Sequence, residues 1–464
     1  MDKLLYKIKK YIPLKIFKTL RPFYHFLFSI ASAIWYRFPS DKLIVIGITG
    51  TTGKTTSVFL MAKMLSDIGY KVGYISTAMF SDGKKEWLND KKMTMPGRFF
   101  IQKMLFEMVK NKCHYAIVET TSEGIEQFRH RFINYDILIF TGLYPEHIES
   151  HGSFENYRKA KGKLFAYLKK CHTKYVDDKK VVKLADSGIK KIILNKIKKI
   201  IIINTDDKEA DYFFNFWAEE KMGYKIDNEN YQNKYNIIKY GKIKSDIHGI
   251  NFIVNNLEIK LNILGEFNVS NAMNAVCLGL SQGIDLAKIA DSLSKIQQVP
   301  GRLELIKEAQ PFTIIVDYSF EPGAMTKLYE TIEVLPHQKI IHLLGSCGGG
   351  RDTSYRSEKG KIAGAKADIV IITNEDPYDE DPQNIINQVS LGAISSGKIL
   401  EKNLFKILDR RDAIHKALSL AKEGDLVLIT GKGCEQAICV ASGEKIPWDD
   451  RRVVKEELKD FLFI

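Results

Sequence analysis

The sequence predicts an α/β protein of two domains, the first built on a phosphate loop and a mostly parallel, doubly wound sheet, the second Rossmann-like. The first indication is a run of mostly β-branched residues, 43–46, that leads through a glycine loop at 47–53 into a helical pattern at 57–68. Strand, glycine loop and helix in this order are the context of a phosphate loop. Strand-like and helical stretches then alternate, and a second such series begins after residues 300–304. Alternation of this kind is typical of parallel sheets covered by helices.

Each domain is predicted from short apolar runs separated by amphipathic stretches. Before residue 300 we expect helices at 98–110 and 154–168, and strands at Val72–Ser76, Tyr115–Glu119, Ile137–Thr141 and Lys199–Asn204. After residue 300 we expect strands at Thr313–Val316, Lys339–Leu344, Ile369–Thr373 and Leu426–Ile429. The predicted organisation is a basic, aromatic helical segment at 1–41, a central domain at 42–300 and a C-terminal domain at 301–464.

Composition limits the class of protein. The chain has 464 residues, of which 45% are hydrophobic and 27% charged, as in a globular protein with two or three cores. The net charge of +13 favours phosphates, anionic substrates or an anionic membrane, but no nucleic-acid-binding motif is present, so we expect no nucleic-acid partner. Six scattered cysteines without a Cys-x-x-Cys pair indicate reduced thiols and a cytoplasmic protein.

The first 41 residues differ from the rest. Seven basic residues precede Pro22, and an aromatic-rich run follows at Phe23–Tyr36. The run is short for a membrane span and has no small-residue cleavage site. Two interpretations remain: a helix packed on the first domain, or an interfacial helix that brings residues 1–38 to the inner face of an anionic membrane.

The glycine loop carries the predicted nucleotide site. Its backbone N–H groups can turn onto phosphate oxygens, Lys54 can reach the β- and γ-phosphates, and the Thr55 hydroxyl can bind Mg²⁺. We therefore expect ATP and Mg²⁺ to be bound by Gly50, Thr51, Thr52, Gly53, Lys54, Thr55 and Thr56.

Two later segments follow predicted strands at the same sheet edge. Glu119 ends one strand, where it could bind a second cation near the γ-phosphate or be a solvated acid. His147 and His151 are four residues apart, which would place them on one helix face if the segment is helical.

Four motifs make the central domain resemble that of the Mur ligases. They are the loop at 49–56, Glu-Thr-Thr-Ser at 119–122, Phe-Thr-Gly-Leu-x-x-Glu-His-x-x-x-His-Gly at 140–152, and Tyr-x-x-Ala-Lys at 157–161. One loop residue departs, because the family usually has Asn where this chain has Thr52. The resemblance implies an ATP-binding domain in which Glu119 and His147 help to hold a second Mg²⁺. It also implies that Lys161 is carbamylated and helps to hold the cation.

The resemblance extends to the nucleotide base and to the second domain. Phe-Asn-Val-x-Asn at 267–271 implies that Asn268 and Asn271 lie around the adenine, although both could instead cap a helix. Pro-Gly-Arg and Val-Asp-Tyr imply that Arg302 and Asp317 face the nucleotide.

Motifs near residues 345–352, 373–382, 409–414 and 431–435 resemble the Mur ligase branch that makes UDP-N-acetylmuramoyl-tripeptide. There the C-terminal ligase domain holds the incoming amino acid. The implied contacts here are Arg351, Asp376, Tyr378, Gly431 and Glu435.

Two substitutions depart from that branch. Tyr378 replaces an arginine that reads diaminopimelate, and Cys434 replaces a histidine. Because the tyrosine cannot form the bidentate carboxylate clamp, the usual diaminopimelate contact is not supported. The acidic residues Glu375, Asp376 and Glu435 would suit an amino acid with an ammonium-bearing side chain.

The resemblance covers residues 42–464, and residues 1–41 occupy the place where relatives carry a UDP-sugar domain. We therefore expect the acceptor to be a small peptide held by the central domain, or a muropeptide presented at a membrane.

The predicted function is an ATP-dependent amide ligase of peptidoglycan-precursor synthesis that acts through an acyl phosphate, with Lys54, Glu119, His147 and Lys161 as catalytic residues. Its partners would be small molecules: ATP, an amino acid and a muropeptide-like acceptor. The alternatives are a folylpolyglutamate synthetase-like ligase and a non-ligating nucleotide-binding subunit of a partner enzyme.

Overall fold

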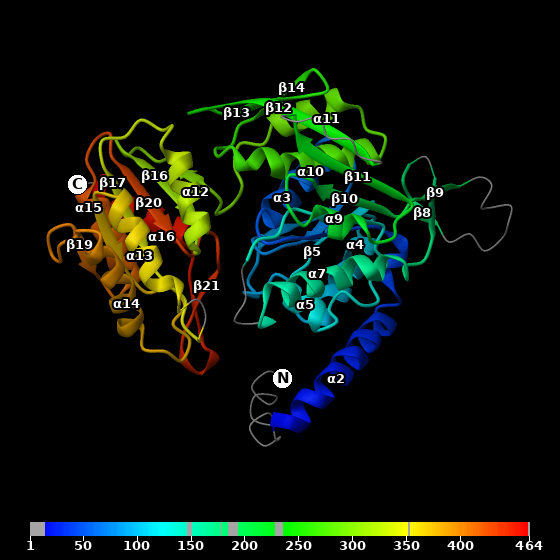
Figure 1. Cartoon of the computed structure of the whole chain (residues 1–464), viewed down its shortest axis with the longest axis horizontal. Helices are drawn as coiled ribbons and strands as arrows, with labels where there is room; N and C mark the ends of the chain where they lie inside the picture. Colours follow the sequence, from blue (N-terminus) through cyan, green and yellow to red (C-terminus); the bar gives the residue numbers. More distant parts are fainter. Residues whose placement is uncertain are drawn as a thin grey trace. The chain divides into compact units, whose positions relative to one another are not determined.

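Strand β1 (Ile44–Thr49) lies at the centre of the first sheet and is buried along its whole length. It pairs in parallel with β5 (Tyr115–Glu119) on one side and β6 (Ile137–Phe140) on the other. Because both faces are covered, the strand is apolar throughout rather than alternating. The computed structural model describes residues 14–145, 151–177, 179–183, 194–227, 235–350 and 353–462 (Figure 1).

The chain forms two compact units. The first comprises residues 1–87, 93–240 and 273–285, and the second residues 88–92, 241–272 and 286–464. The division at residue 300 between the predicted domains stays a prediction.

The first unit is a helix-covered, mostly parallel sheet, which confirms the predicted class. Its strands run in the order β12-β11-β10-β6-β1-β5-β2-β3-β4. The flanking strands are β2 (Val72–Ile75), β3 (Met79–Ser81), β4 (Glu86–Leu88), β10 (Ile200–Asn204), β11 (Glu220–Ile226) and β12 (Asn236–Asp246). Only β3 pairs antiparallel, with β2, among the pairings described for this unit's strands β1–β3, β5, β6 and β10–β12.

Helices cover this sheet and enclose one apolar core that includes Leu138, Phe140, Phe165 and Phe213. They are α3 (Lys54–Asp67), α4 (Arg98–Lys110), α5 (Ser122–Glu126), α7 (Phe154–Leu168), α9 (Ala210–Phe214) and α10 (Phe267–Ser281). A small separate sheet consists of β7 (Lys174–Val176), β8 (Val182–Lys183) and β9 (Asn195–Ile197).

A buried charge cluster fixes the amino ends of the central strands. Asp136 accepts hydrogen bonds from Lys174 at 2.5 Å, from Lys199 at 2.8 Å and from the backbone N–H of Val45 at 2.8 Å. Lys174 also donates to the carbonyls of Ser40 and Leu43, at 2.9 and 2.7 Å. The cluster therefore ties the segment before β1 to the sheet, at the edge opposite the glycine loop.

Helix α2 (Leu14–Trp35) precedes a short 3₁₀ helix, Pro39–Lys42. Its carboxyl half packs on the first unit: the Ser29 hydroxyl donates to the Phe128 carbonyl at 2.9 Å, and the rings of Phe26 and Phe132 lie 5.5 Å apart. The predicted helix is thus present and partly packed. Among the helices of the described residues, none has the length and apolar character that crossing a membrane requires.

The second unit contains the Rossmann-like sheet predicted from the sequence. Its order is β15-β16-β20-β17-β18-β19, and all its pairs are parallel except β15 with β16. The strands are β15 (Glu304–Ile306), β16 (Thr313–Asp317), β17 (Ile340–Leu344), β18 (Ile369–Ile372), β19 (Leu404–Lys406) and β20 (Leu426–Thr430).

Two apolar cores, one around Leu328 and Val389 and one around Ile414 and Val454, are built from this sheet and its helices. The helices are α12 (Pro322–Ile332), α13 (Tyr355–Lys366), α14 (Pro382–Ser395), α15 (Arg410–Leu420) and α16 (Asp450–Leu462). A further helix of this unit, α11 (Leu286–Ser294), contributes no described residue to either core. The unit also has the hairpins β13 (Gly249–Val254) with β14 (Leu257–Leu261) and β21 (Ala437–Cys439) with β22 (Lys445–Pro447), and a 3₁₀ turn at Ala441–Gly443.

Candidate active site

The glycine loop joins β1 to α3 and bends tightly against a neighbouring strand end. At Gly50 a Cβ atom would lie 2.0 Å from the Thr141 hydroxyl, so no larger residue fits without displacing Thr141. Gly53 has φ of 79° immediately before α3, a conformation that glycine adopts at little cost. The Thr141 hydroxyl also donates to the Thr52 carbonyl at 2.7 Å, which fixes the loop to the end of β6.

Two lysines converge on this loop. Lys54, the first residue of α3, donates to the carbonyls of Gly50 at 3.0 Å and Thr51 at 2.6 Å. Lys161 donates to the same Gly50 carbonyl at 2.8 Å, although it is 111 residues away in sequence. Two ammonium groups beside the amino end of a helix create a positive field suited to an anion.

Lys161 is placed by the start of α7. The Ser153 side chain caps this helix by accepting from the N–H of Asn156. Tyr157 and Lys161 are one turn apart on its buried face, and the Lys161 nitrogen lies 4.5 Å from the centre of the Tyr157 ring. Only 1% of Lys161 is exposed.

Glu119 ends β5 and is 1% exposed, so it is not the solvated strand-end acid that the sequence left open. Its carboxylate accepts from the Thr55 hydroxyl at 3.0 and 3.1 Å, and from the backbone N–H and hydroxyl of Thr77, both at 2.8 Å. The Thr77 hydroxyl also lies 2.7 Å from that of Thr94. A hydroxyl and a carboxylate in contact are the hard oxygen donors that Mg²⁺ prefers.

Sequence reasoning missed Thr77 and Thr94. Thr77 follows the predicted strand at 72–76, and its position at a strand's carboxyl end could have identified it. Thr94 lies in a turn without such a pattern. Asp207 was also missed: it follows β10, accepts from the N–H of Leu143 at 2.7 Å, and has a pKa raised by burial.

The second predicted strand-end segment is only partly visible. His147 lies outside the described residues, so its pairing with His151 is not described. The Nε2 atom of His151 lies 3.0 Å from the Ser122 hydroxyl. The ring of His151 is 5.3 Å from that of Tyr157.

In the second unit, the Pro-Gly-Arg turn is fixed to the end of β16. The Asp317 carboxylate accepts from the backbone N–H groups of Leu303 and Ser319, both at 2.7 Å. The Arg302 guanidinium lies 4.3 Å from the centre of the Tyr318 ring. Arg302 and Asp317, both predicted to face the nucleotide, therefore belong to one local structure.

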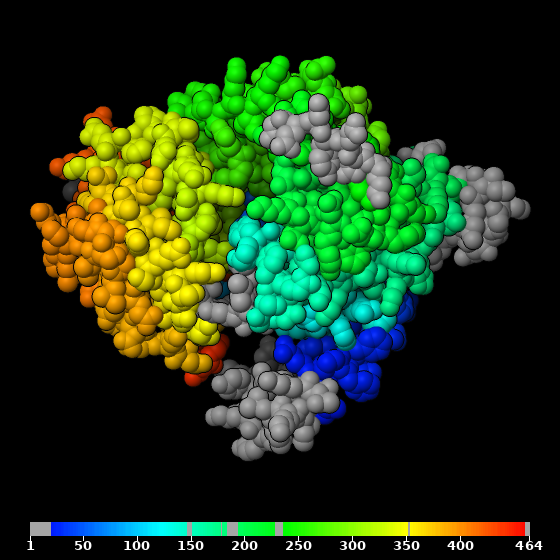
Figure 2. All heavy atoms as spheres, viewed as in Figure 1, coloured from blue at the N-terminus to red at the C-terminus, as the bar shows by residue number. Residues whose placement is uncertain are grey.

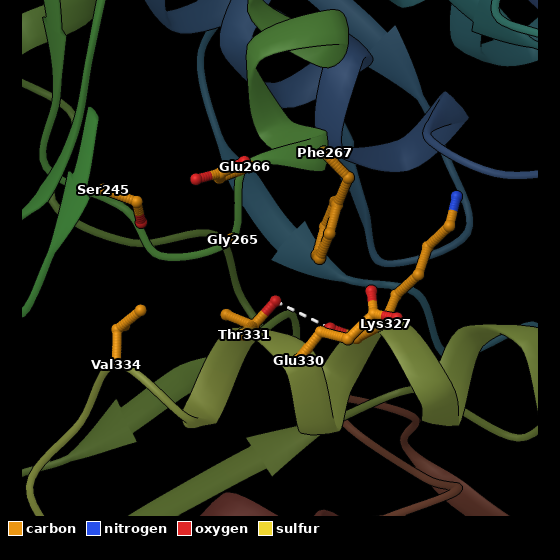
Figure 3. Close-up of a pocket in the computed structure, with 8 residues that line it drawn as sticks. All are labelled: Ser245, Gly265, Glu266, Phe267, Lys327, Glu330, Thr331 and Val334. Atoms are coloured by element: carbon orange, nitrogen blue, oxygen red, sulfur yellow. Dashed lines mark hydrogen bonds between the residues drawn. The ribbon is translucent and has the colours of Figure 1, made fainter. Parts of the chain in front are cut away.

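Asn268 and Asn271 lie in the first turns of α10 and are buried. The Asn268 amide donates to the Leu264 carbonyl at 2.6 Å, and the Asn271 amide donates to the Asn268 side chain at 2.7 Å. Beside them is a pocket of about 130 Å³ into which the Phe267 ring points (Figure 3). Its lining is Ser245, Gly265, Glu266, Phe267, Lys327, Glu330, Thr331 and Val334.

The predicted amino-acid site lies at the carboxyl ends of β18 and β20. Glu375 is buried, and its Oε1 atom accepts from the Cys347 thiol at 3.1 Å. Its Oε2 atom has no hydrogen-bond partner among the described residues and lies against Gly431, where a Cβ would be 2.4 Å away. Tyr378 has φ of 53°, and its N–H donates to the Cys439 carbonyl at 3.1 Å.

Asp376 and Glu435, expected from their charge to suit a substrate ammonium, are paired with lysine side chains of the chain itself in this structure. Lys432 lies 2.8 Å from Asp376 and 2.9 Å from Glu435, and Lys92 pairs with both. Burial alone would raise the Asp376 pKa, but Lys432 and Lys92 lower it below its ordinary value. Arg351 lies outside the described residues.

Cys434, which replaces the family's histidine, is packed against the Pro-Gly-Arg turn. A Cβ on Gly301 would lie 2.3 Å from the Cys434 nitrogen, and burial raises the pKa of the thiol to about 12. At neutral pH the thiol is therefore uncharged and does not replace an imidazole as an acid or base.

Ammonium groups gathered on a glycine loop are suited to the phosphates of a nucleotide, and the adjacent Thr55 and Glu119 suit the accompanying magnesium ion. The fold and this site define a magnesium-dependent enzyme that uses ATP.

Comparison with known families narrows this class. Residues 48–192 and 188–279 match the Mur ligase middle domain, and residues 301–433 match the Mur ligase glutamate ligase domain. The chain belongs to the Mur ligase family. It is therefore an ATP-dependent, ADP-forming ligase that joins an amine to a carboxylate, of the kind that builds peptidoglycan precursors.

Individual relatives agree with this assignment. The chain is 35% identical over 437 residues to a UDP-N-acetylmuramyl-tripeptide synthetase of Borreliella burgdorferi, covering 92% of this chain and 78% of the relative. A solved UDP-N-acetylmuramoyl-L-alanyl-D-glutamate–2,6-diaminopimelate ligase is 25% identical with a TM-score of 0.57, covering 91% and 79%. Folylpolyglutamate synthase of Mycobacterium tuberculosis shares the fold, with a TM-score of 0.62 at 15% identity, covering 87% and 91%.

Replacing Lys54 by alanine should remove the ammonium group that reaches the loop from the start of α3. We expect a loss of roughly 3–4 kcal/mol of transition-state stabilisation, on the order of a hundredfold to a thousandfold in kcat, as for other single electrostatic groups. The rate of ADP release at saturating substrate concentrations measures this loss in kcat. Lys63→Ala, on the exposed face of the same helix, is the matched control and should keep its activity. Wild-type turnover in the Lys54 variant would contradict the assignment of the loop.

Proposed function

We propose that the protein adds an amino acid to the carboxylate of a muropeptide-like acceptor, as a tripeptide synthetase does. The observation that carries this proposal is the convergence of Lys54 and Lys161 on the Gly50 carbonyl, beside the contact between Thr55 and Glu119. That cluster suits phosphoryl transfer from ATP to a carboxylate.

In this reaction an oxygen of the acceptor carboxylate attacks the γ-phosphorus, and the bond to ADP breaks. The loop N–H groups and Lys54 hold the phosphate oxygens and offset the charge that develops on them. The amine of the amino acid then attacks the acyl carbon of the acyl phosphate, and phosphate leaves as the amine loses a proton. The loop residues Gly50 to Thr56 thus act in the first step, which determines whether the acceptor is activated.

We assign the magnesium ligands to Thr55 and Glu119, with a second ion held by Glu119, His147 and a modified Lys161. Magnesium bound there would neutralise phosphate charge. Carbamylation joins the neutral Lys161 amine to CO₂ with loss of a proton and gives an anionic oxygen ligand. The burial of Lys161 against the loop, where its nitrogen reaches the Gly50 carbonyl at 2.8 Å, supports this role.

Lys161→Ala should abolish ligation while leaving ATP binding largely intact, because the loop itself is unchanged. Short-chain carboxylates or high bicarbonate should partly restore activity by supplying an oxygen ligand. Calorimetry measures ATP binding, and an assay of ADP release measures ligation. Lys163→Ala, on the same helix but paired with Glu126 at the surface, is the control. Full activity of the Lys161 variant without additives would show that this lysine is not a ligand.

For the nucleotide base, we assign Asn268 and Asn271, with the Phe267 ring and its pocket beside them. Asparagine amides can pair with a purine edge, and an aromatic ring can stack on it. Arg302 and Asp317 are assigned to the nucleotide from their turn at β16.

For the amino acid, we assign Arg351, Asp376, Tyr378, Gly431 and Glu435. Tyr378 lacks the guanidinium that clamps a carboxylate, so we do not propose diaminopimelate as the amino acid.

A substrate screen tests this function directly. ADP release should require both an amino acid and a muramoyl-dipeptide or lipid-linked acceptor. Release of ADP with a folate acceptor and glutamate instead would favour the second candidate function, that of a folylpolyglutamate-type ligase. The chain shares its fold with a folylpolyglutamate synthase. ATP binding without product under every combination would favour a non-ligating subunit.

We also propose that α2 docks the enzyme on an anionic membrane surface. Helix α2 runs outward from the sheet and the other helices of the first unit in Figure 1, and its dark-blue atoms lie at the surface in Figure 2. Phe23 and Trp35 are 62% and 74% exposed, and further exposed apolar residues are Leu20, Tyr24, Phe26, Leu27, Phe28 and Ile34.

Positive charge surrounds this apolar surface. Burial and the neighbouring Arg98, Arg21 and Arg129 together lower the pKa of His25 to about 4. Burial, with Arg129 and Arg21, also lowers the pKa of Arg98, so these arginines lie close enough to repel one another. An anionic headgroup layer would relieve that repulsion.

Full-length protein should sediment with anionic vesicles, and binding should weaken as salt rises because part of the attraction is screened. The double variant Phe23→Ser, Trp35→Ser should lose most binding while ADP release on water-soluble acceptors continues. Trp217→Ser, an exposed aromatic on another element, is the control. Equal sedimentation of the double variant and the wild type would exclude this docking surface.

A further inference from the structure

The ammonium of Lys92 lies between two acidic side chains of the second unit, Asp376 and Glu435. Lys92 belongs to the short segment Leu88–Lys92, which groups with that unit although its neighbours in sequence do not. Its side chain is only 6% exposed, and its ammonium lies 2.8 Å from the Asp376 carboxylate and in contact with Glu435. Lys92 has φ of 55°, so the turn is held in a conformation that few non-glycine residues adopt.

The surrounding charges are balanced. Lys432 donates to Asp376 and to the Ala437 carbonyl, at 2.8 and 2.7 Å, and it also lies 2.9 Å from Glu435. The remaining oxygens have their own donors: the Cys439 N–H reaches Asp376 at 2.7 Å, and the Tyr318 hydroxyl reaches Glu435 at 3.2 Å. Two carboxylates thus meet two ammonium groups.

Lys92 is held firmly as a cation. Burial alone would lower its pKa, but Glu435 and Asp376 raise it above the ordinary value for lysine. Removing one partner from a buried, paired cluster is costly, because the remaining charges lose their compensation. A substrate ammonium could bind these carboxylates only by displacing Lys92.

We propose that Lys92 is a specificity-determining residue: its tethered ammonium fills the position that the side-chain ammonium of a basic amino acid would take, and so excludes lysine, ornithine and similar substrates. This inference rests on the proposed amino-acid site. The amino acid that the enzyme accepts then has no second ammonium at this position. Without Lys92, Lys432 alone would face the carboxylates of Asp376 and Glu435. The volume that Lys92 leaves would then fit the side chain of a lysine substrate, whose ammonium would restore the balance of charge.

The test compares L-lysine with L-norleucine, which has a similar length and no ammonium. Lys92→Ala removes the charge and vacates the volume, so the ratio of kcat/KM for lysine to that for norleucine should rise roughly tenfold or more, as expected for one hydrogen bond to a charged group. Butylammonium should compete with lysine in this variant, since it supplies the same cation.

Two further variants separate charge from folding. Lys92→Arg keeps the cation and should keep the exclusion of lysine. Lys91→Ala changes the neighbouring lysine, which pairs with Asp90 at the surface, and should behave as the wild type. Lys92→Ser, which also vacates the volume but keeps a small polar group, replaces Lys92→Ala if the latter melts at a lower temperature than the other variants.

An unchanged ratio in Lys92→Ala, or a wild-type enzyme that already prefers lysine, overturns the proposal. Calorimetric binding of lysine and norleucine to the same proteins decides the question independently of turnover. If the wild type ligates no amino acid, the proposed function fails, whereas selective lysine binding by the Lys92→Ala protein would still support the role of Lys92.

Discussion

The Gly50 carbonyl, which accepts hydrogen bonds from both Lys54 and Lys161, is the contact on which the first unit's chemistry depends. Lys54 reaches it from the start of the helix that follows the loop, and Lys161 reaches it from a helix more than a hundred residues further on. The loop can approach the end of β6 this closely because Gly50 has no side chain, and a Cβ there would collide with Thr141. The loop, the end of β6 and helix α7 are thereby fixed together, and Lys54 lies at the place where phosphates are expected. Glu119 and Thr55 complete the same edge with oxygen donors.

In the second unit, charge pairing controls the predicted amino-acid site. Asp376 and Glu435 are matched by Lys432 and Lys92, while Glu375 keeps an oxygen without a hydrogen-bond partner among the described residues. The two regions therefore differ in their electrostatics: two lysines converge on the phosphate loop, whereas in the amino-acid region Asp376 and Glu435 are paired with lysines. Such a site selects amino acids in two ways. Carboxylates that already pair with lysines of the chain do not attract a further cation, and the charged groups that remain are available to the substrate.

Sequence reasoning predicted the features that depend on local pattern. The apolar run before Gly47, the glycines and the alternation of strands and helices predicted both sheets, and the strand-end position identified Glu119. The place of Lys161 could be predicted only through family resemblance, since Lys159 and Lys163 have the same local pattern. Contacts made by tertiary structure were not accessible: Lys92 and Asp376 are 284 residues apart, and nothing near Lys92 predicts a buried ion pair. Thr77 reaches Glu119 because β2 lies beside β5, a register that the sequence does not encode locally.

The central claim is that the acceptor carboxylate is activated by direct transfer of the γ-phosphoryl group at the loop built around Gly50. The most direct measurement uses an acceptor whose reacting carboxylate carries heavy oxygen, followed by mass analysis of the inorganic phosphate after one turnover. The account predicts that one labelled oxygen appears in the phosphate, because the attacking oxygen leaves with it when the amine displaces it. Unlabelled phosphate released together with the amide product would contradict an acyl phosphate and the role assigned to this site.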